Sequence, residues 1–297
     1  MNKSDNMMNN KTVIIAALLC AAPCIALAQE APKAVEFDLA KATAAFHSCD
    51  YALARDLSAK AAADGDAEAQ NMLCAVYMGD NDVSPAEPAP GTTATIKEIA
   101  ESKVAAKYAE ALKWCRKSAD QGNMRATVNL AGIYRRGLGV KKDYAKAMEL
   151  YSKAATDDPL AEYLVGMMHY RGQGVKEDPA EALKWFGKAA GRGLPEAMLA
   201  MGVMYEFGKG VQADQASAAK WYRMAAAKNY AQAEFYLGDM YLRGRGVAKD
   251  EDQALSWYRK AADHGNAEAK RYLERKAKRE MSHGMDALND AVNFGNP

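Results

Sequence analysis

The sequence predicts an all-α fold, an α-solenoid of antiparallel helix pairs with about six repeat units and a C-terminal capping helix. A unit of about 36 residues recurs along the chain, and this period is typical of a helical array. The unit is clearest in VGMMHYRGQGVKEDPAEALKWFGKAAGRG at 165–193, MGVMYEFGKGVQADQASAAKWYRMAAAKN at 201–229 and LGDMYLRGRGVAKDEDQALSWYRKAADHG at 237–265. Since one helix pair cannot bury its apolar face alone, stacked neighbours must share a continuous core.

Residues 1–28 have the pattern of a secretory signal peptide. Lys3 and Lys11 precede an apolar run, and the run ends in small residues before the Ala28–Gln29 bond, where we expect cleavage. A transmembrane helix is the competing interpretation, but the run is short and contains Pro23. We therefore expect an exported protein, periplasmic or secreted, with no membrane insertion after cleavage.

The charge balance gives no indication of a nucleic-acid or anionic-membrane partner. The chain has 39 Lys and Arg against 38 Asp and Glu, and removal of Lys3, Lys11 and Asp5 with the signal peptide leaves 37 of each. Nucleic-acid-binding domains usually carry a clear basic excess. No nucleic acid is therefore expected among the partners.

The first helix of each unit carries a small residue, which lets a second backbone approach closely. These small residues are Ala131, Gly166, Gly202 and Gly238. The second helix carries an aromatic-rich pair that, with spaced alanines, forms one apolar stripe. The pairs are Trp114-Cys115, Leu150-Tyr151, Trp185-Phe186, Trp221-Tyr222 and Trp257-Tyr258. We interpret these aromatic residues as core packing rather than as a ligand site.

The connector between the two helices has the fixed form Gly-x-Gly-Val, and its glycines can adopt positive φ at a helix end. It begins at Gly137, Gly172, Gly208 and Gly244. An aspartate follows three residues after each valine, where it is expected to cap the second helix. These aspartates are Asp143, Asp178, Asp214 and Asp250. The connectors do not match a phosphate-binding loop, and no cofactor or metal site is predicted.

The motifs L-G-x-x-Y-x-x-G-x-G-V-x-x-D and A-x-x-W-Y-x-K-A-A resemble the Sel-one-like repeat family, a longer relative of the tetratricopeptide repeat. The resemblance implies a right-handed α-superhelix that acts as an adaptor or scaffold for protein complexes. The expected organisation is a signal peptide at 1–28, a flexible N-terminus at 29–35, degenerate repeats at 36–122 with a Pro-rich insertion near 80–94, four regular repeats at 123–265, and a capping helix and tail at 266–297.

The second degenerate unit lacks the glycine connector and is about 21 residues longer than a regular unit. Thr95-Ile96-Lys97-Glu98 has the form of a capping box, so the second helix should begin near residue 96. The insertion is either a regulatory or partner-binding loop or a tolerated surface excursion. We favour the second interpretation.

Three cysteines remain after signal cleavage, namely Cys49, Cys74 and Cys115. Cys74 stands at the small-residue position of its first helix and Cys115 at the second aromatic position of its second helix, and these positions face each other in a pair. We predict a Cys74–Cys115 disulfide with Cys49 free. Pairing of Cys49 with Cys74 is the main alternative.

The helix after residue 266 carries many charges on its outer side, as expected of a polar cap. Beyond Met281 we expect either a separate short helix at 285–293 or a frayed end.

A partner is expected on the concave side, which the first helix of each pair lines in such arrays. Aromatic, methionine and arginine side chains in this strip are typical of protein interfaces. The predicted contact residues are Val128, Arg135, Tyr163, Met167, Tyr170, Arg171, Leu199, Val203, Glu206, Phe235, Asp239, Leu242 and Arg243. We expect a protein or peptide partner, and the sequence leaves its identity, the pathway and the oligomeric state open.

The leading hypothesis is thus a non-enzymatic scaffold without catalytic residues. The alternative is a cell-wall-related amide hydrolase or a penicillin-binding protein, because some cysteine-rich relatives in the resembled family are described so. Ser217 and Lys220 form an S-x-x-K motif, but neither S-D-N nor K-T-G accompanies it. An oligomerisation module or a factor aimed at a host protein is a third possibility.

Overall fold

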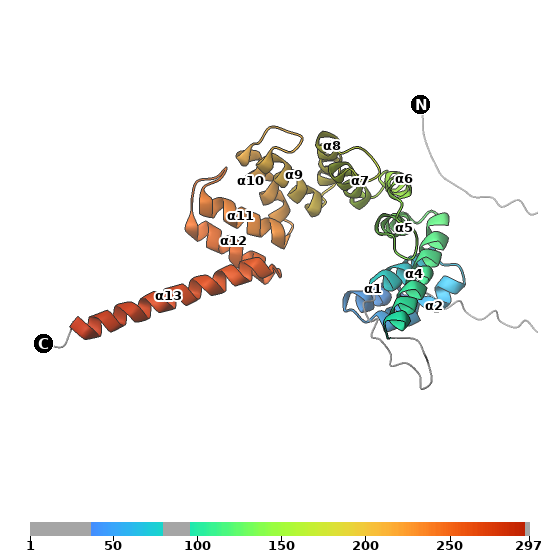
Figure 1. Cartoon of the computed structure of the whole chain (residues 1–297), viewed down its shortest axis with the longest axis horizontal. Coiled ribbons are helices and arrows are strands. Elements are labelled where there is room, and N and C mark those ends of the chain that lie inside the picture. The colour runs from blue at the N-terminus through green and yellow to red at the C-terminus, as the bar shows by residue number, and fades with distance from the viewer. Residues whose placement is uncertain (1–36, 80–95, 295–297) are drawn as a thin grey trace, which may run out of the picture. The chain divides into compact units, whose positions relative to one another are not determined.

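The computed structural model describes residues 37–79 and 96–294, and these residues are helical apart from turns and connectors, without a strand. Figure 1 shows the helices in chain order. Their bounds are α1 Leu39–His47, α2 Tyr51–Ala63, α3 Ala67–Gly79, α4 Ile96–Asp120, α5 Met124–Arg136, α6 Tyr144–Ala154, α7 Pro159–Arg171, α8 Pro179–Gly191, α9 Pro195–Phe207, α10 Gln215–Ala226, α11 Ala231–Arg243, α12 Glu251–Asp263 and α13 Ala267–Phe294. The predicted signal peptide and the 80–94 insertion lie outside the described residues.

Consecutive helices pack against each other along the chain. The main contacts lie within the pairs α3–α4, α5–α6, α7–α8, α9–α10 and α11–α12. Each second helix also packs against the first helix of the next pair, as α8 does against α9 and α10 against α11. This arrangement confirms the prediction of an all-α solenoid.

Close packing at the small residue of the first helix holds each regular pair together. A Cβ atom added to Gly166 would lie 2.7 Å from the ring of Phe186, and one added to Gly238 would lie 2.9 Å from the ring of Tyr258. Both rings are buried. The small residues and the second aromatic residue of each pair are therefore core positions, as predicted.

The connectors bind successive units together. Gly172 ends α7 in the left-handed conformation, with φ of 62°. Gly174, two residues later, packs against the preceding unit, where an added Cβ would lie 2.8 Å from the carbonyl oxygen of Tyr144 at the start of α6. The second connector glycine thus allows two backbones to meet, a role that the sequence analysis did not assign to it.

The predicted N-caps are confirmed. The carboxylate of Asp178 accepts a hydrogen bond from the Glu181 amide at 2.9 Å, and that of Asp250 accepts one from the Gln253 amide at 2.9 Å. The carboxylates at 143 and 214 bind the first turns of α6 and α10 in the same way. The regular row of carboxylates is therefore explained by helix capping.

The irregular second unit contains the predicted disulfide. Cys74 of α3 is bonded to Cys115 of α4, and their Cα atoms are 5.1 Å apart. Cys49 is free and exposed, so pairing of Cys49 with Cys74 is wrong. Helix α4 begins at Ile96, as predicted from the capping box.

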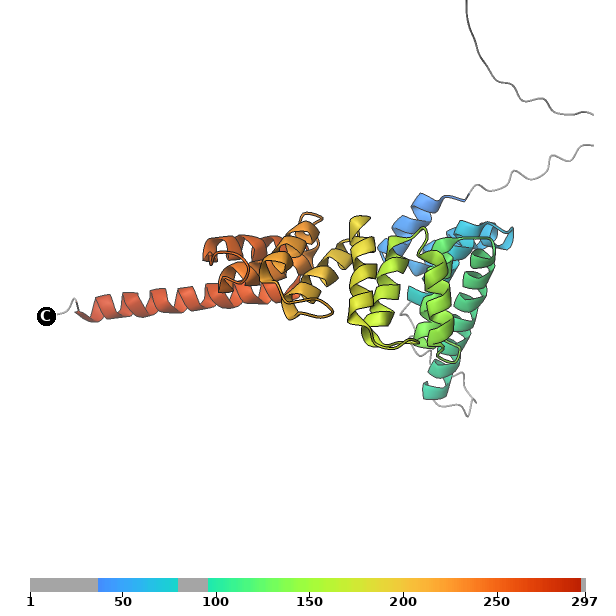
Figure 2. The same cartoon turned by 90° about the horizontal axis from the view of Figure 1, so that it is seen from above.

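The last helix differs from the expectation. Residues 267–294 form one continuous helix, α13, so the separate short helix expected at 285–293 is wrong. Both views show α13 continuing beyond α12, against which it packs (Figures 1 and 2). Glu274 occupies the position of Gly238 in the preceding unit, and a side chain of this size excludes the close approach of a further helix.

Candidate partner-binding surface

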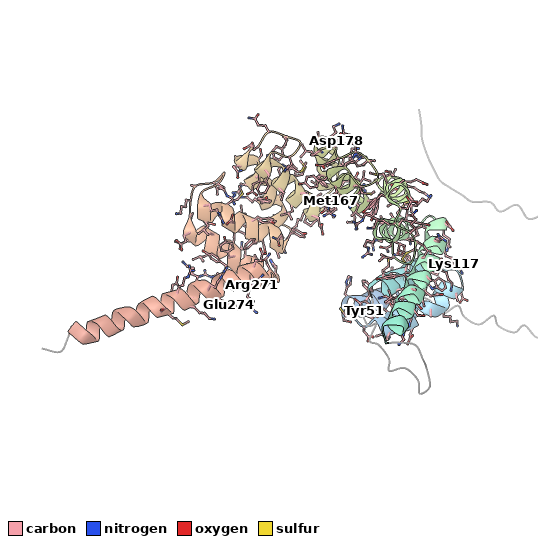
Figure 3. All side chains as sticks on the ribbon, in the orientation of Figure 1. Tyr51, Lys117, Met167, Asp178, Arg271 and Glu274 are labelled. Atoms are coloured by element: carbon pink, nitrogen blue, oxygen red, sulfur yellow. A yellow bond between two sulfur atoms is a disulfide. The ribbon has the colours of Figure 1, made fainter. Side chains whose placement is uncertain are left out.

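The first-helix face is the surface formed by the predicted contact residues on α5, α7, α9 and α11 together with their exposed neighbours Arg136 and Phe207, and the predicted residues differ in exposure. Val128 is 8% exposed and belongs to the core, so it offers no surface. Arg171 and Arg243 are exposed. The others are half-buried, namely Arg135, Tyr163, Met167, Tyr170, Leu199, Val203, Glu206, Phe235, Asp239 and Leu242. In Figure 3, Met167 and the cap Asp178 lie on opposite sides of the α7–α8 pair.

Two aromatic residues of this face take part in packing between helices. The ring of Tyr163 lies 5.5 Å from that of Phe186, and the ring of Phe235 lies 5.5 Å from that of Tyr258. Burial raises the pKa of Tyr163, and the nearby carboxylate of Glu196 raises it further. These side chains therefore stabilise the repeats and leave only part of their surface for a partner.

A polar network links the unit of α9 and α10 to the next one. The Tyr222 hydroxyl donates to one carboxylate oxygen of Glu206 at 2.6 Å, and Arg245 binds the other at 2.9 Å. Arg245 also binds Asp239, whose second oxygen lies 2.7 Å from Nε of Arg243. The Glu206 side chain is only 7% exposed. Two predicted contact residues, Glu206 and Asp239, thus have their carboxylates occupied within the protein.

Arg245 was missed by the sequence analysis. It fills the variable position of the Gly244-x-Gly246 connector, which holds Leu138, Gln173 and Lys209 in the other regular units. Only the structure shows that this position lies over Glu206. Burial raises the pKa of Tyr222, and its hydrogen bond to Glu206 acts in the same direction, so the hydroxyl stays protonated and donates to the carboxylate.

The C-terminal ends of the four first helices present the most accessible part of the face. The exposed residues there occupy equivalent positions, and they are Arg136, Arg171, Phe207 and Arg243. Phe207 is 62% exposed, which is unusual for a phenylalanine, and its equivalents in the other units are arginines. An exposed aromatic ring among guanidinium groups has the composition of an interaction hot spot.

A cavity of about 570 Å³ lies where α11 and α12 meet α13. We call it the end pocket. Its lining residues are Phe235, Asp239, Leu242, Arg243, Tyr258, Glu268, Arg271, Tyr272, Glu274, Arg275 and Lys278. Four of them, Phe235, Asp239, Leu242 and Arg243, belong to the predicted contact residues. The sequence analysis treated the α13 residues of this pocket only as a polar cap.

The end pocket has an aromatic floor. The rings of Phe235 and Tyr258 are 5.5 Å apart, and those of Tyr258 and Tyr272 are 4.5 Å apart. The charged side chains of α13 stand at the rim, where Figure 3 marks Arg271 and Glu274. The volume and composition suit a few side chains of a peptide rather than a large folded surface.

The serine of the S-x-x-K motif takes part in the cap of α10. The Ser217 hydroxyl donates to Asp214 at 2.6 Å, within the cap of α10. This hydrogen bond, with those from the Ser217 and Ala216 amides, lowers the pKa of Asp214, and a carboxylate of low pKa is a weak general base. Ser217 is therefore explained by helix capping.

Within 37–79 and 96–294, no group of three or more His, Cys, Asp or Glu residues is arranged to hold a metal ion. The helices of that part of the chain include none that is long and apolar enough to cross a membrane.

Comparison with known proteins gives a consistent result. The family model described as "Sel1 repeat" matches residues 102–123, 125–158, 159–194, 195–230 and 231–266. A Sel1 repeat protein from Oxalobacter formigenes is 31% identical with a TM-score of 0.61, and the match covers 78% of this chain and 86% of that one. The protein c5321 of uropathogenic Escherichia coli, described as a protective antigen with an SLR fold, is 27% identical with a TM-score of 0.51. That match covers 72% of this chain and 50% of c5321. No curated protein matches in sequence.

Proposed function

The chain belongs to the Sel1 repeat family, a type of helical scaffold for protein–protein interaction, and we propose that it is an exported, non-enzymatic adaptor that binds a protein or peptide partner on its first-helix face. Proteins of this family are generally non-catalytic. The location of the proposed binding face is inferred from which side chains of α5, α7, α9 and α11 are exposed and which are held by contacts within the protein.

The observation that carries the proposal is the exposure of Phe207 between arginines of neighbouring units. An exposed phenylalanine costs solvation free energy in the free protein, and this cost is recovered when a partner covers the ring. The arginines at 136 and 171 have no ion-pair partner among the described residues, so their guanidinium groups can bind a partner's carboxylates or carbonyls.

Export is supported by the signal-like residues 1–28 and by the Cys74–Cys115 disulfide, which is compatible with an oxidising compartment. The mature protein would then begin at Gln29 and meet its partner in the periplasm or outside the cell.

The proposal is tested by affinity capture from an envelope extract with the chain from Gln29 onward. The test variant is Arg171→Glu with Phe207→Ser. The matched control is Lys220→Glu with Met224→Ser on α10, where the charge and the exposed apolar side chain are changed on the second helix instead. These variants are preferable to alanine at Tyr163 or Phe235, because those rings pack against the core.

We expect the wild type and the α10 control to retain the same partner, identified by mass spectrometry, and the Arg171/Phe207 variant to lose it. Equal retention by both variants would place the binding surface elsewhere. Turnover of a chromogenic β-lactam that disappears in Ser217→Ala would favour the hydrolase alternative.

A further inference from the structure

We infer that the end pocket binds an acidic peptide segment that carries an apolar anchor residue. This inference rests on the proposed scaffold function and adds to it the location of one contact and the chemical class of the partner. It depends on three properties of the pocket. The floor is apolar, the carboxylate of Asp239 is already bound by arginines, and cationic side chains are spaced along α13.

The floor requires an apolar group from the ligand. Phe235 and Tyr272 are half-buried, and together with Leu242 they present ring and aliphatic carbon next to the buried ring of Tyr258. Covering this carbon surface with a leucine or phenylalanine side chain removes it from water, and aromatic residues contribute strongly to such contacts. A ligand that is only charged would leave the floor uncovered.

The α11 wall offers hydrogen-bond donors rather than acceptors. Asp239 already binds two guanidinium groups, those of Arg243 and Arg245, through its two different oxygens. Arg243 binds Asp239 through Nε, and its side chain is 63% exposed. The terminal nitrogens of Arg243 can therefore donate to a ligand, whereas Asp239 is poorly placed to bind an additional cation.

The α13 wall presents a row of cations. Arg271, Arg275 and Lys278 are exposed and follow each other at i, i+4 and i+7, so they span about 10 Å along one side of the helix. The Nε atoms of Arg271 and Arg275 bind main-chain carbonyls of α13, at 3.2 and 3.3 Å, and leave their terminal nitrogens for other acceptors. Lys278 has no ion-pair partner among the described residues.

Two carboxylates share this wall, Glu268 and Glu274, and both are exposed. They reduce the positive charge but do not cancel it, because three cations of α13 and Arg243 of α11 face them. A cationic peptide would meet four positive side chains around the floor, which disfavours it. An acidic segment would meet guanidinium groups that can bind carboxylates with two parallel hydrogen bonds.

The test measures binding of short fluorescein-labelled peptides to the full mature chain by fluorescence anisotropy. The acidic probe has one phenylalanine flanked by aspartates and glutamates. The basic probe replaces the acids with lysines, and the neutral probe replaces them with serines and asparagines. The test variant is Arg271→Glu with Arg275→Glu, and the matched control is Arg125→Glu with Arg259→Glu, two exposed arginines outside the pocket.

We expect the acidic probe to bind at least about tenfold more tightly than either other probe, with an affinity that falls as salt is added. The Arg271/Arg275 variant should lose about tenfold in affinity for the acidic probe, and the control should change less than about twofold. Thermal unfolding of both variants checks that the surface changes leave the fold intact.

Equal binding of all three probes, preference for the basic probe, or an equal loss in the test and control variants would overturn the inference. So would the absence of binding to any probe. In each of these cases the scaffold proposal is judged separately by the affinity capture, which depends on Arg171 and Phe207 and not on the end pocket.

Discussion

The α7–α8 unit and the α3–α4 unit join their two helices through different contacts at equivalent positions. In the regular unit, Gly166 lets the ring of Phe186 press against the α7 backbone. In the irregular unit the same two positions hold Cys74 and Cys115, which form a covalent bond. In both units a contact between the middle of the first helix and the middle of the second joins the pair.

The two units also differ in their connections. The regular unit has a connector whose second glycine, Gly174, packs against the backbone at the start of α6. The irregular unit has no Gly-x-Gly-Val motif in the sequence between α3 and α4. The disulfide holds together the pair whose linking segment is longest, where the entropic cost of closing the loop is greatest.

The largest effect is expected from removing the disulfide. The bond closes a loop with a sequence separation of 41, so Cys74→Ala with Cys115→Ala should lower the free energy of unfolding by about 4 kcal/mol. Urea unfolding with and without reductant measures this loss. Reductant should destabilise the wild type and leave the double variant unchanged, and Cys49→Ser should behave as the wild type does. A double variant as stable as the wild type would mean that the irregular pair does not need the bond.

In the regular unit, adding a single methyl group at Gly166 should destabilise the protein. Gly166→Ala places a Cβ 2.7 Å from the Phe186 ring and should lower the free energy of unfolding by about 2 kcal/mol, because overpacking exceeds the gain in helix propensity. Gly187→Ala in the neighbouring helix is the control, since its nearest contact is Met201 at 4.0 Å. That change should stabilise the protein by up to about 1 kcal/mol. Thermal unfolding should therefore separate the two variants in opposite directions.

The polar network around Glu206 is tested with Tyr222→Phe. Loss of the hydrogen bond to Glu206 should cost about 2 kcal/mol, because the acceptor is a buried carboxylate.

The raised pKa of Tyr222 also makes stability depend on pH. Above about pH 10 the unfolded tyrosine loses its proton while the folded one keeps it, so the unfolded state binds fewer protons and stability falls as pH rises. Unfolding from pH 8 to 11 should show a shallower fall in the variant; identical slopes would contradict the assignment.

The smallest effect is expected at the helix caps of the regular units. Asp250→Ala should cost about 1 kcal/mol, because the Gln253 amide loses its acceptor. Asp252→Ala, an exposed acid in the first turn of the same helix, should cost less. Equal losses would indicate that only the negative charge matters.

Repeated local patterns could be predicted from the sequence, whereas contacts between units could not. The glycines, aspartate caps and aromatic pairs recur at a fixed spacing, so the helix pairs and the Cys74–Cys115 bond follow from their positions. The network around Arg245 occurs at one junction between two units and joins residues from different helices, so no period marks it. For the same reason the sequence predicts Glu206 and Asp239 as partner contacts, whereas the structure shows their carboxylates bound within the protein.

Of the two expectations for the chain beyond Met281, the separate helix at 285–293 is wrong. Glycine in a helix costs about 1 kcal/mol relative to alanine, and Gly284 lies in this segment. The surrounding residues are nevertheless helical, and α13 runs through it. The end pocket was missed because its walls come from helices whose contact is set by the packing of α12 on α13.

The most direct test of the partner-binding face is site-specific photo-crosslinking in the cell of origin. Benzoylphenylalanine is introduced in place of Phe207 on α9 and, in a second strain, in place of Met224 on α10. These side chains are 62% and 39% exposed and lie on the two helices of one unit. We predict a discrete crosslinked partner from position 207 and none from position 224. A partner crosslinked only from position 224 would contradict the assignment of binding to the first-helix face.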